Sequence, residues 1–264
     1  MPGRPDGMVV GFPSQPYPRY SYPLLAVLDL FLDVLMGGHR DFRRDALLCV
    51  ERLKPPLQVL GEENILCRGP CVLTFNHYYR PGFRAWWLAL AITAVVPAHI
   101  HWIMTSSWRC EGMWYRPILS PVTRWLLPAL TRVYDFTAMP AIPPDPRDAE
   151  DRARAVRRVL TYVKGDRYAI IGLAPEGGDM PGGILTWPPS GVGRFALLLA
   201  GTGLKFIPVG AFEQDGVFYL RFGKAYFLSL LKGLSSQEKD RQAARIVMEN
   251  IACQLPPHLR GEFA

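Results

Sequence analysis

The stretch FNHYYRPG, residues 75–82, ends an apolar run with an asparagine, a histidine and a proline–glycine turn. Two later stretches also lie at the ends of apolar runs or within them, LAPEGGDMPGG at 173–183 and FIPVGAF at 206–212. Each is expected near the end of a strand, and open α/β sheets place their ligand sites beyond the carboxyl ends of strands. Singly, each pattern has an ordinary structural explanation. Together, the three stretches mark the place where a site is expected.

Strands and helices alternate around these stretches. Strands are expected at 57–60, 71–75, 100–105, 132–136, 168–173, 206–209 and 218–222. Helices are expected at 83–96, 149–163, 192–200 and 235–254, with proline-punctuated helical turns at 116–130. This alternation favours an α/β fold, with a mixed, mostly parallel sheet flanked by helices.

The first 54 residues precede that body. Residues 1–20 are dense in proline and glycine and are expected to form a flexible arm. Apolar periodicity predicts helices at 21–36 and 43–53, which together would make an N-terminal helical hairpin over 21–54. Residues 55–264 are then expected to form one α/β domain. The hairpin is consistent with membrane contact and with ordinary packing alike.

The charge of the chain favours an anionic partner, since the net charge is +7 and the isoelectric point about 9.3. Between Arg68 and Arg132 there are seven arginines, no lysine and six of the seven tryptophans. Arginine beside tryptophan suits a phosphate-bearing interface such as an anionic membrane surface, although a buried aromatic core with solvated arginines gives the same composition. No nucleic-acid-binding signature accompanies it, so nucleic acid is not expected as a partner. The longest apolar run, 85–98, is too short to span a bilayer, which favours a peripheral protein.

Cysteine and histidine patterns do not predict a metal site. The five cysteines have no regular spacing, which is typical of free thiols in a reducing compartment and indicates a cytoplasmic protein. His99 and His101 share one face of a predicted strand and could join His77 in a metal site. Neither a carboxylate nor a cysteine stands close by to complete it, so no metal is expected.

In their order and spacing, the three stretches resemble the phospholipid and glycerol acyltransferase superfamily, in particular the 1-acylglycerol-3-phosphate acyltransferases. That family carries an Asn-His-x4-Asp block, then a Phe-Pro-Glu-Gly-Thr-Arg-Ser block, then a Val-Pro-Val strand. Here Asn76-His77 opens the first block, Pro175-Glu176-Gly177 matches the core of the second, and 207–209 matches the third. The resemblance covers roughly residues 55–225.

The resemblance implies a glycerolipid acyltransferase-like fold and transfer of a fatty acyl group from a thioester donor to a lipid-like hydroxyl or amine acceptor. His77 would be the general base, and Asn76, Arg80, Pro175, Glu176 and Gly177 would bind substrate. The donor would be acyl-CoA or acyl-ACP, and no cofactor is expected. The protein would act on the inner face of the membrane.

Two departures from the family pattern lead to two hypotheses. Gly82 stands where the family has the aspartate that orients its histidine, and Asp179 stands where the family has a phosphate-binding arginine. In one hypothesis Asp179 replaces the missing carboxylate, and the acceptor is not a simple phosphomonoester. In the other, the catalytic pair has decayed and the fold is kept for binding lipid or a partner.

Overall fold

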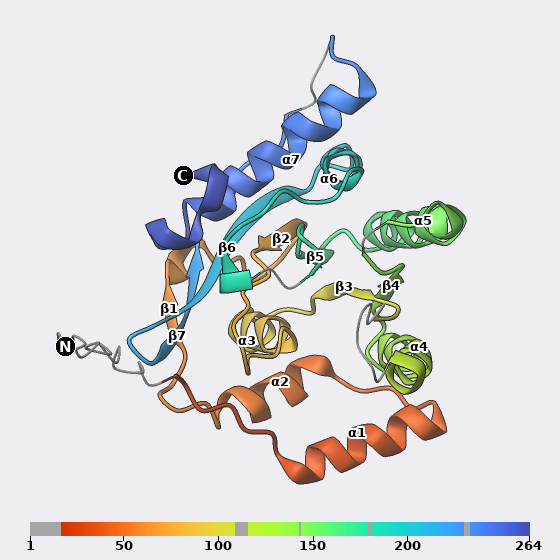
Figure 1. The fold of residues 1–264 in the computed structure, drawn as a ribbon, viewed down its shortest axis with the longest axis vertical. Coiled ribbons are helices and arrows are strands. Elements are labelled where there is room, and N and C mark those ends of the chain that lie inside the picture. The colour runs from red at the N-terminus through yellow and green to blue at the C-terminus, as the bar shows by residue number, and fades with distance from the viewer. Residues whose placement is uncertain (1–16, 109–115, 143, 179–180, 230–232) are drawn as a thin grey trace, which may run out of the picture.

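The computed structural model describes residues 17–108, 116–142, 144–178, 181–229 and 233–264 (Figure 1). Its centre is a seven-stranded sheet in the order β1-β7-β6-β2-β5-β3-β4. The strands are β1 (Gln58–Leu60), β2 (Cys71–Phe75), β3 (His101–Thr105), β4 (Thr137–Met139), β5 (Ile170–Leu173), β6 (Lys205–Gln214) and β7 (Val217–Phe222). Every neighbouring pair is parallel except β6 with β7, which confirms the predicted mixed, mostly parallel sheet.

The composition of the strands accounts for this pairing. All five residues of β2 are buried, as expected for a strand covered on both faces of a parallel sheet. The single antiparallel pair is a hairpin whose two-residue turn is Asp215-Gly216, and both residues have positive φ. A turn with positive φ at both residues matches the twist of the strands, and Asp-Gly is a preferred pair for it.

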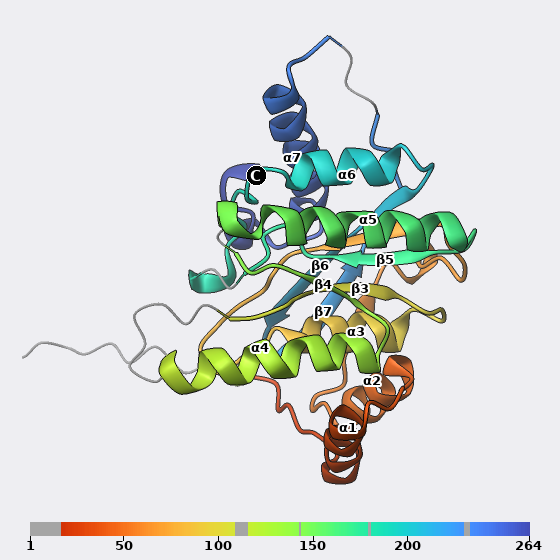
Figure 2. The same ribbon diagram turned by 90° about the vertical axis from the view of Figure 1, so that its right-hand side faces the viewer.

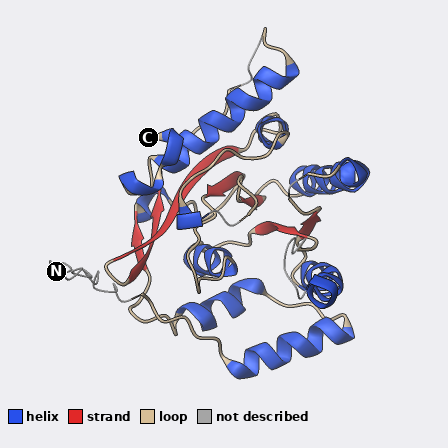
Figure 3. Cartoon of the chain, viewed as in Figure 1, coloured by secondary structure: helices blue, strands red, loops and turns tan. Residues whose placement is uncertain are grey.

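Helices cover both faces of the sheet (Figures 2 and 3). They are α1 (Leu24–Met36), α2 (Phe42–Val50), α3 (Trp86–Val95), α4 (Arg116–Val133), α5 (Ala149–Gly165), α6 (Val192–Ala200) and α7 (Ser236–Ala252). The last three lie on one face, and α3 and α4 lie on the other. Helix α2 packs on α3, and α1 is outermost, beside α4. The largest buried side chains belong to this layered core, among them Trp87, Phe206, Phe212 and Phe218.

One predicted strand is wrong. Residues 132–136 form the end of α4 and the following turn, and the strand begins only at Thr137. The expected succession of helical turns at 116–130 is instead one helix that contains Pro121 and Pro128. Each proline removes one N–H donor from the helix, and Ala129 and Val133 of the same helix are buried in the core.

The two N-terminal helices occupy the predicted positions, with bounds shifted by a few residues. Arg40, between them, binds Asp45 through two N–H groups at 2.8 Å each and Asp33 through a third at 2.8 Å. The Tyr134 hydroxyl donates to the same Asp45 at 2.8 Å, which ties the turn between the helices to the end of α4. Among the described residues, no helix is both long and apolar enough to cross a membrane.

Candidate active site

The strands that lead to the first two motif stretches are neighbours in the sheet. Strands β2 and β5 pair in parallel, so Asn76-His77 and Pro175-Glu176 emerge at the same edge. There the backbone N–H of His77 donates to Glu176 Oε2 at 2.7 Å. The expected meeting of the two stretches at the carboxyl edge of the sheet is therefore found.

Asn76 joins the third stretch to the first. Its side-chain amide donates to the carbonyl of Ala211 at 2.8 Å, and its Oδ1 accepts from the Ala211 N–H at 2.7 Å. The side chain is 1% exposed and thus extends the ladder between β2 and β6 by one more pair of hydrogen bonds. In this structure Asn76 holds the backbone that carries His77.

Glu176 is almost entirely buried, and its carboxylate is occupied by backbone donors. Besides the His77 N–H it accepts the Thr186 N–H at 2.9 Å and the Thr186 hydroxyl at 3.4 Å. Burial raises the pKa of Glu176, and the two backbone donors, the nearby His77 imidazole and the Thr186 hydroxyl oppose that shift. Gly177 has φ of 69°, a left-handed conformation that residues with a Cβ rarely adopt, so glycine fits this turn. Glu176 thus joins the backbone at Thr186 to the backbone at His77.

Arg80 is paired with a carboxylate that sequence reasoning missed. Its Nε donates to Glu213 Oε2, and its Nη2 donates to Glu213 Oε1 at 2.9 Å. Both side chains are nearly buried. The hydroxyls of Tyr20 and Tyr78 donate to Glu213 at 2.5 and 3.2 Å. Burial raises the pKa of both phenols, so they stay protonated and donate. Tyr17 covers the Arg80 guanidinium at 3.9 Å from its ring centroid.

This Glu213 network binds the N-terminal segment to the loop that carries His77. Residues 17–20 fall in the stretch expected to be a flexible arm, yet Tyr20 packs on Phe83 and Trp87. No local pattern marks Glu213 as the partner of Arg80, because the two lie 133 positions apart in the sequence. Substrate binding by Arg80 stays a prediction, since the guanidinium would have to serve Glu213 and substrate together.

His77 lies just beyond the carboxyl end of β2. The residue is half-buried at the edge of the sheet, and Gly82 is exposed with φ of 84°. Asp179, the proposed orienting carboxylate, lies outside the described residues. The catalytic role of His77 and the substrate-binding roles of Asn76, Pro175, Glu176 and Gly177 stay predictions.

His101, the first residue of β3, is held in the core by ring stacking and a hydrogen bond. His101 is buried, stacks on Tyr162 with ring centroids 4.1 Å apart and forms a hydrogen bond with Thr137 at 2.8 Å. Burial lowers the pKa of His101 to about 4, so its ring is neutral near pH 7. Within the described ranges, no three His, Cys, Asp or Glu side chains are grouped so as to hold a metal ion.

We expect Glu176→Gln to destabilise the protein by about 1–3 kcal/mol, because an amide offers one acceptor oxygen and turns its NH₂ toward the other backbone N–H. Since the pKa of Glu176 is raised, the stability contributed by its carboxyl group is fully present below pH 4.5 and is lost as pH rises through the folded-state pKa. The difference in unfolding free energy between wild type and variant should therefore narrow as pH rises above 4.5.

Denaturant unfolding over a pH series measures both effects. The control is Glu150→Gln, on an 84% exposed side chain, which should stay within about 0.5 kcal/mol of wild type. A Glu176→Gln variant as stable as this control at every pH would contradict the role given to the buried carboxylate.

Comparison with known proteins gives a structural likeness and no match by sequence. No protein-family model matches the chain, and no curated protein matches its sequence. Among solved structures, it is similar to the crystal structure of the 1-acyl-sn-glycerophosphate (LPA) acyltransferase PlsC from Thermotoga maritima. The TM-score is 0.43 and the identity 16%, over 85% of this chain and 92% of that chain. These values are too low to carry PlsC's activity over to this chain, so function has to be argued from the site itself.

Proposed function

We propose that this chain is a divergent acyltransferase that moves a fatty acyl group from a thioester donor to a hydroxyl or amine acceptor at a membrane surface. The observation that carries the proposal is the 2.7 Å hydrogen bond from the His77 N–H to Glu176. It joins the two sequence blocks that resemble the acyltransferase signature at the sheet edge where α/β folds bind ligands.

His77 is the general base in this proposal. Its neutral imidazole takes the proton of the acceptor hydroxyl while the acceptor oxygen attacks the thioester carbonyl carbon. The tetrahedral intermediate collapses as the carbon–sulfur bond breaks, and the leaving thiolate receives that proton. Asn76 and Glu176 support the reaction by fixing the backbone on both sides of the histidine, since general-base catalysis needs the imidazole held in hydrogen-bonding reach of the acceptor.

The charges near His77 favour an acceptor without a phosphomonoester at this position. Glu213 occupies two N–H groups of Arg80, and Glu176 adds a second buried carboxyl group. In our proposal Asp179 supplies the carboxylate that orients His77, which would further disfavour a phosphate there.

A catalytically decayed scaffold that binds lipid or a partner is the second candidate. The observation in its favour is Gly82, whose position carries a carboxylate in the family that the sequence resembles. Loss of an orienting carboxylate reduces catalysis about 10⁴-fold in serine proteases, enough to abolish measurable turnover.

Membrane contact is proposed through α1. Eight of its thirteen residues are large, exposed hydrophobic side chains: Leu24, Leu25, Val27, Leu28, Phe31, Leu32, Leu35 and Met36. An apolar face of this size, outermost in the fold, suits the interfacial region of a bilayer. The arginines of 84–125 would add attraction to anionic lipid on the inner face of the cytoplasmic membrane.

The catalytic proposal is tested by thioester turnover across acyl-CoA and acyl-ACP donors with hydroxyl and amine acceptors. We expect His77→Ala to lower turnover by about 10²–10⁴-fold, because a positioned general base contributes that factor. Asp179→Asn should lower it comparably through loss of orientation. If wild type and His77→Ala are equally inert on every donor–acceptor pair, the decayed scaffold is favoured. If only His77→Ala loses turnover, the orienting role of Asp179 is excluded and the general-base role of His77 stands.

The membrane proposal is tested by co-sedimentation with anionic vesicles. Phe31→Asp should reduce the bound fraction by about tenfold, since it places a charge on the apolar face of α1. Phe227→Asp is the matched control, because Phe227 is exposed to a similar degree (64% against 53%) but lies outside this face. Binding by wild type should weaken with salt. Recovery of wild type in the supernatant regardless of vesicles would contradict the proposal.

A further inference from the structure

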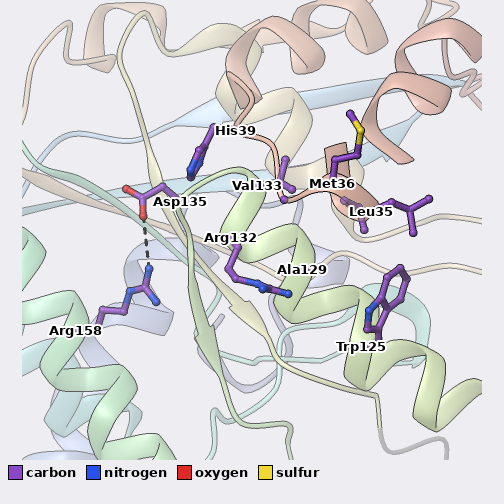
Figure 4. Close-up of a pocket in the computed structure, with 11 residues that line it drawn as sticks. Leu35, Met36, His39, Trp125, Ala129, Arg132, Val133, Asp135 and Arg158 are labelled. Atoms are coloured by element: carbon purple, nitrogen blue, oxygen red, sulfur yellow. Dashed lines mark ion pairs between the residues drawn. The ribbon is translucent and has the colours of Figure 1, made fainter. Parts of the chain in front are cut away.

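A cavity of about 540 Å³ opens between the end of α1, the second half of α4 and the middle of α5 (Figure 4). It is lined from three separate parts of the chain, which meet here because α1 packs beside α4. None of the residues in the resemblance motifs lines it. The candidate active site therefore does not explain this cavity.

The walls of the cavity differ in chemistry. One side is apolar, with Leu35 and Met36 from α1 facing Trp125 from α4. Arg132 lies between these side chains and the ion pair of Arg158 with Asp135, whose atoms are 3.5 Å apart. Within the described ranges Arg132 has no ion pair, and its guanidinium donates one hydrogen bond, at 3.4 Å, to the Pro128 carbonyl. The Arg132 guanidinium, which is paired with no carboxylate of the described residues, thus lies beside the apolar wall.

The cavity and His77 lie at opposite edges of the sheet. Strands β2, β5, β3 and β4 are parallel, and His77 follows the carboxyl end of β2. Asp135, on the cavity wall, precedes the amino end of β4. Anything bound in the cavity would therefore sit away from the proposed acyl transfer.

We infer that this cavity binds a bilayer phospholipid with an anionic headgroup, its phosphate on Arg132 and the start of an acyl chain against Leu35, Met36 and Trp125. A guanidinium forms paired hydrogen bonds with phosphate, and tryptophan favours the boundary between headgroup and acyl chain. The apolar wall continues into the exposed face of α1, so a lipid in the cavity remains part of the bilayer that α1 contacts. The inference rests on the membrane contact proposed above and is independent of turnover at His77.

Calorimetric titration with dihexanoylphosphatidylglycerol, kept below its micelle concentration, tests the site without a bilayer. Arg132→Gln should weaken binding by about tenfold or more, since a charge-assisted phosphate contact is lost. Arg157→Gln is the matched control, because Arg157 is exposed on the same helix as Arg158 but does not line the cavity. It should bind as wild type does.

Two further arms separate the explanations. Met36→Ser should weaken the short-chain lipid but leave any binding of inorganic phosphate unchanged, because it alters only the apolar wall. His77→Ala should bind lipid as wild type does, so failure of the catalytic proposal would not be mistaken for failure of this one. No lipid binding by wild type, or equal losses in Arg132→Gln and Arg157→Gln, would overturn the inference.

Discussion

The buried carboxylate of Glu176 is the constraint on which the candidate site depends. A carboxylate that is 2% exposed is costly unless donors surround it, and here the donors are backbone N–H groups from two distant segments, at His77 and Thr186. Because both donors belong to the backbone, Glu176 fixes the loops at His77 and Thr186 whatever side chains those loops carry. Asn76 adds the same kind of constraint toward β6, so three strands of the sheet fix the histidine.

Local patterns were sufficient for most of the fold. Strand β2 and helix α6 lie where the sequence predicts them, because a short apolar run between turns and an amphipathic period are local properties. The predicted strand at 132–136 is wrong because its apolar and aromatic residues suit a buried helix end equally well, and packing against the sheet decided between them. Such choices are tertiary and leave no local signal.

The location of the candidate site could be predicted from the sequence, whereas the contacts of its residues could not. Parallel neighbouring strands bring Asn76-His77 and Pro175-Glu176 together, as their positions after strands suggest. The pattern gave no sign that Asn76 and Glu176 bind backbone, or that Glu213 engages Arg80, Tyr20 and Tyr78. The Glu213 contacts join residues 133 to 193 positions apart, so they follow from the completed fold and not from any short motif.

The measurement that tests the central claim most directly is a crystal structure with a non-hydrolysable acyl thioester analogue bound. If His77 is the base of an acyltransferase, the analogue's carbonyl should lie beside its imidazole at the carboxyl edge of β2 and β5, with the His77–Glu176 hydrogen bond intact. An analogue bound elsewhere, with no contact to His77, would contradict the claim that this edge is an acyl-transfer site.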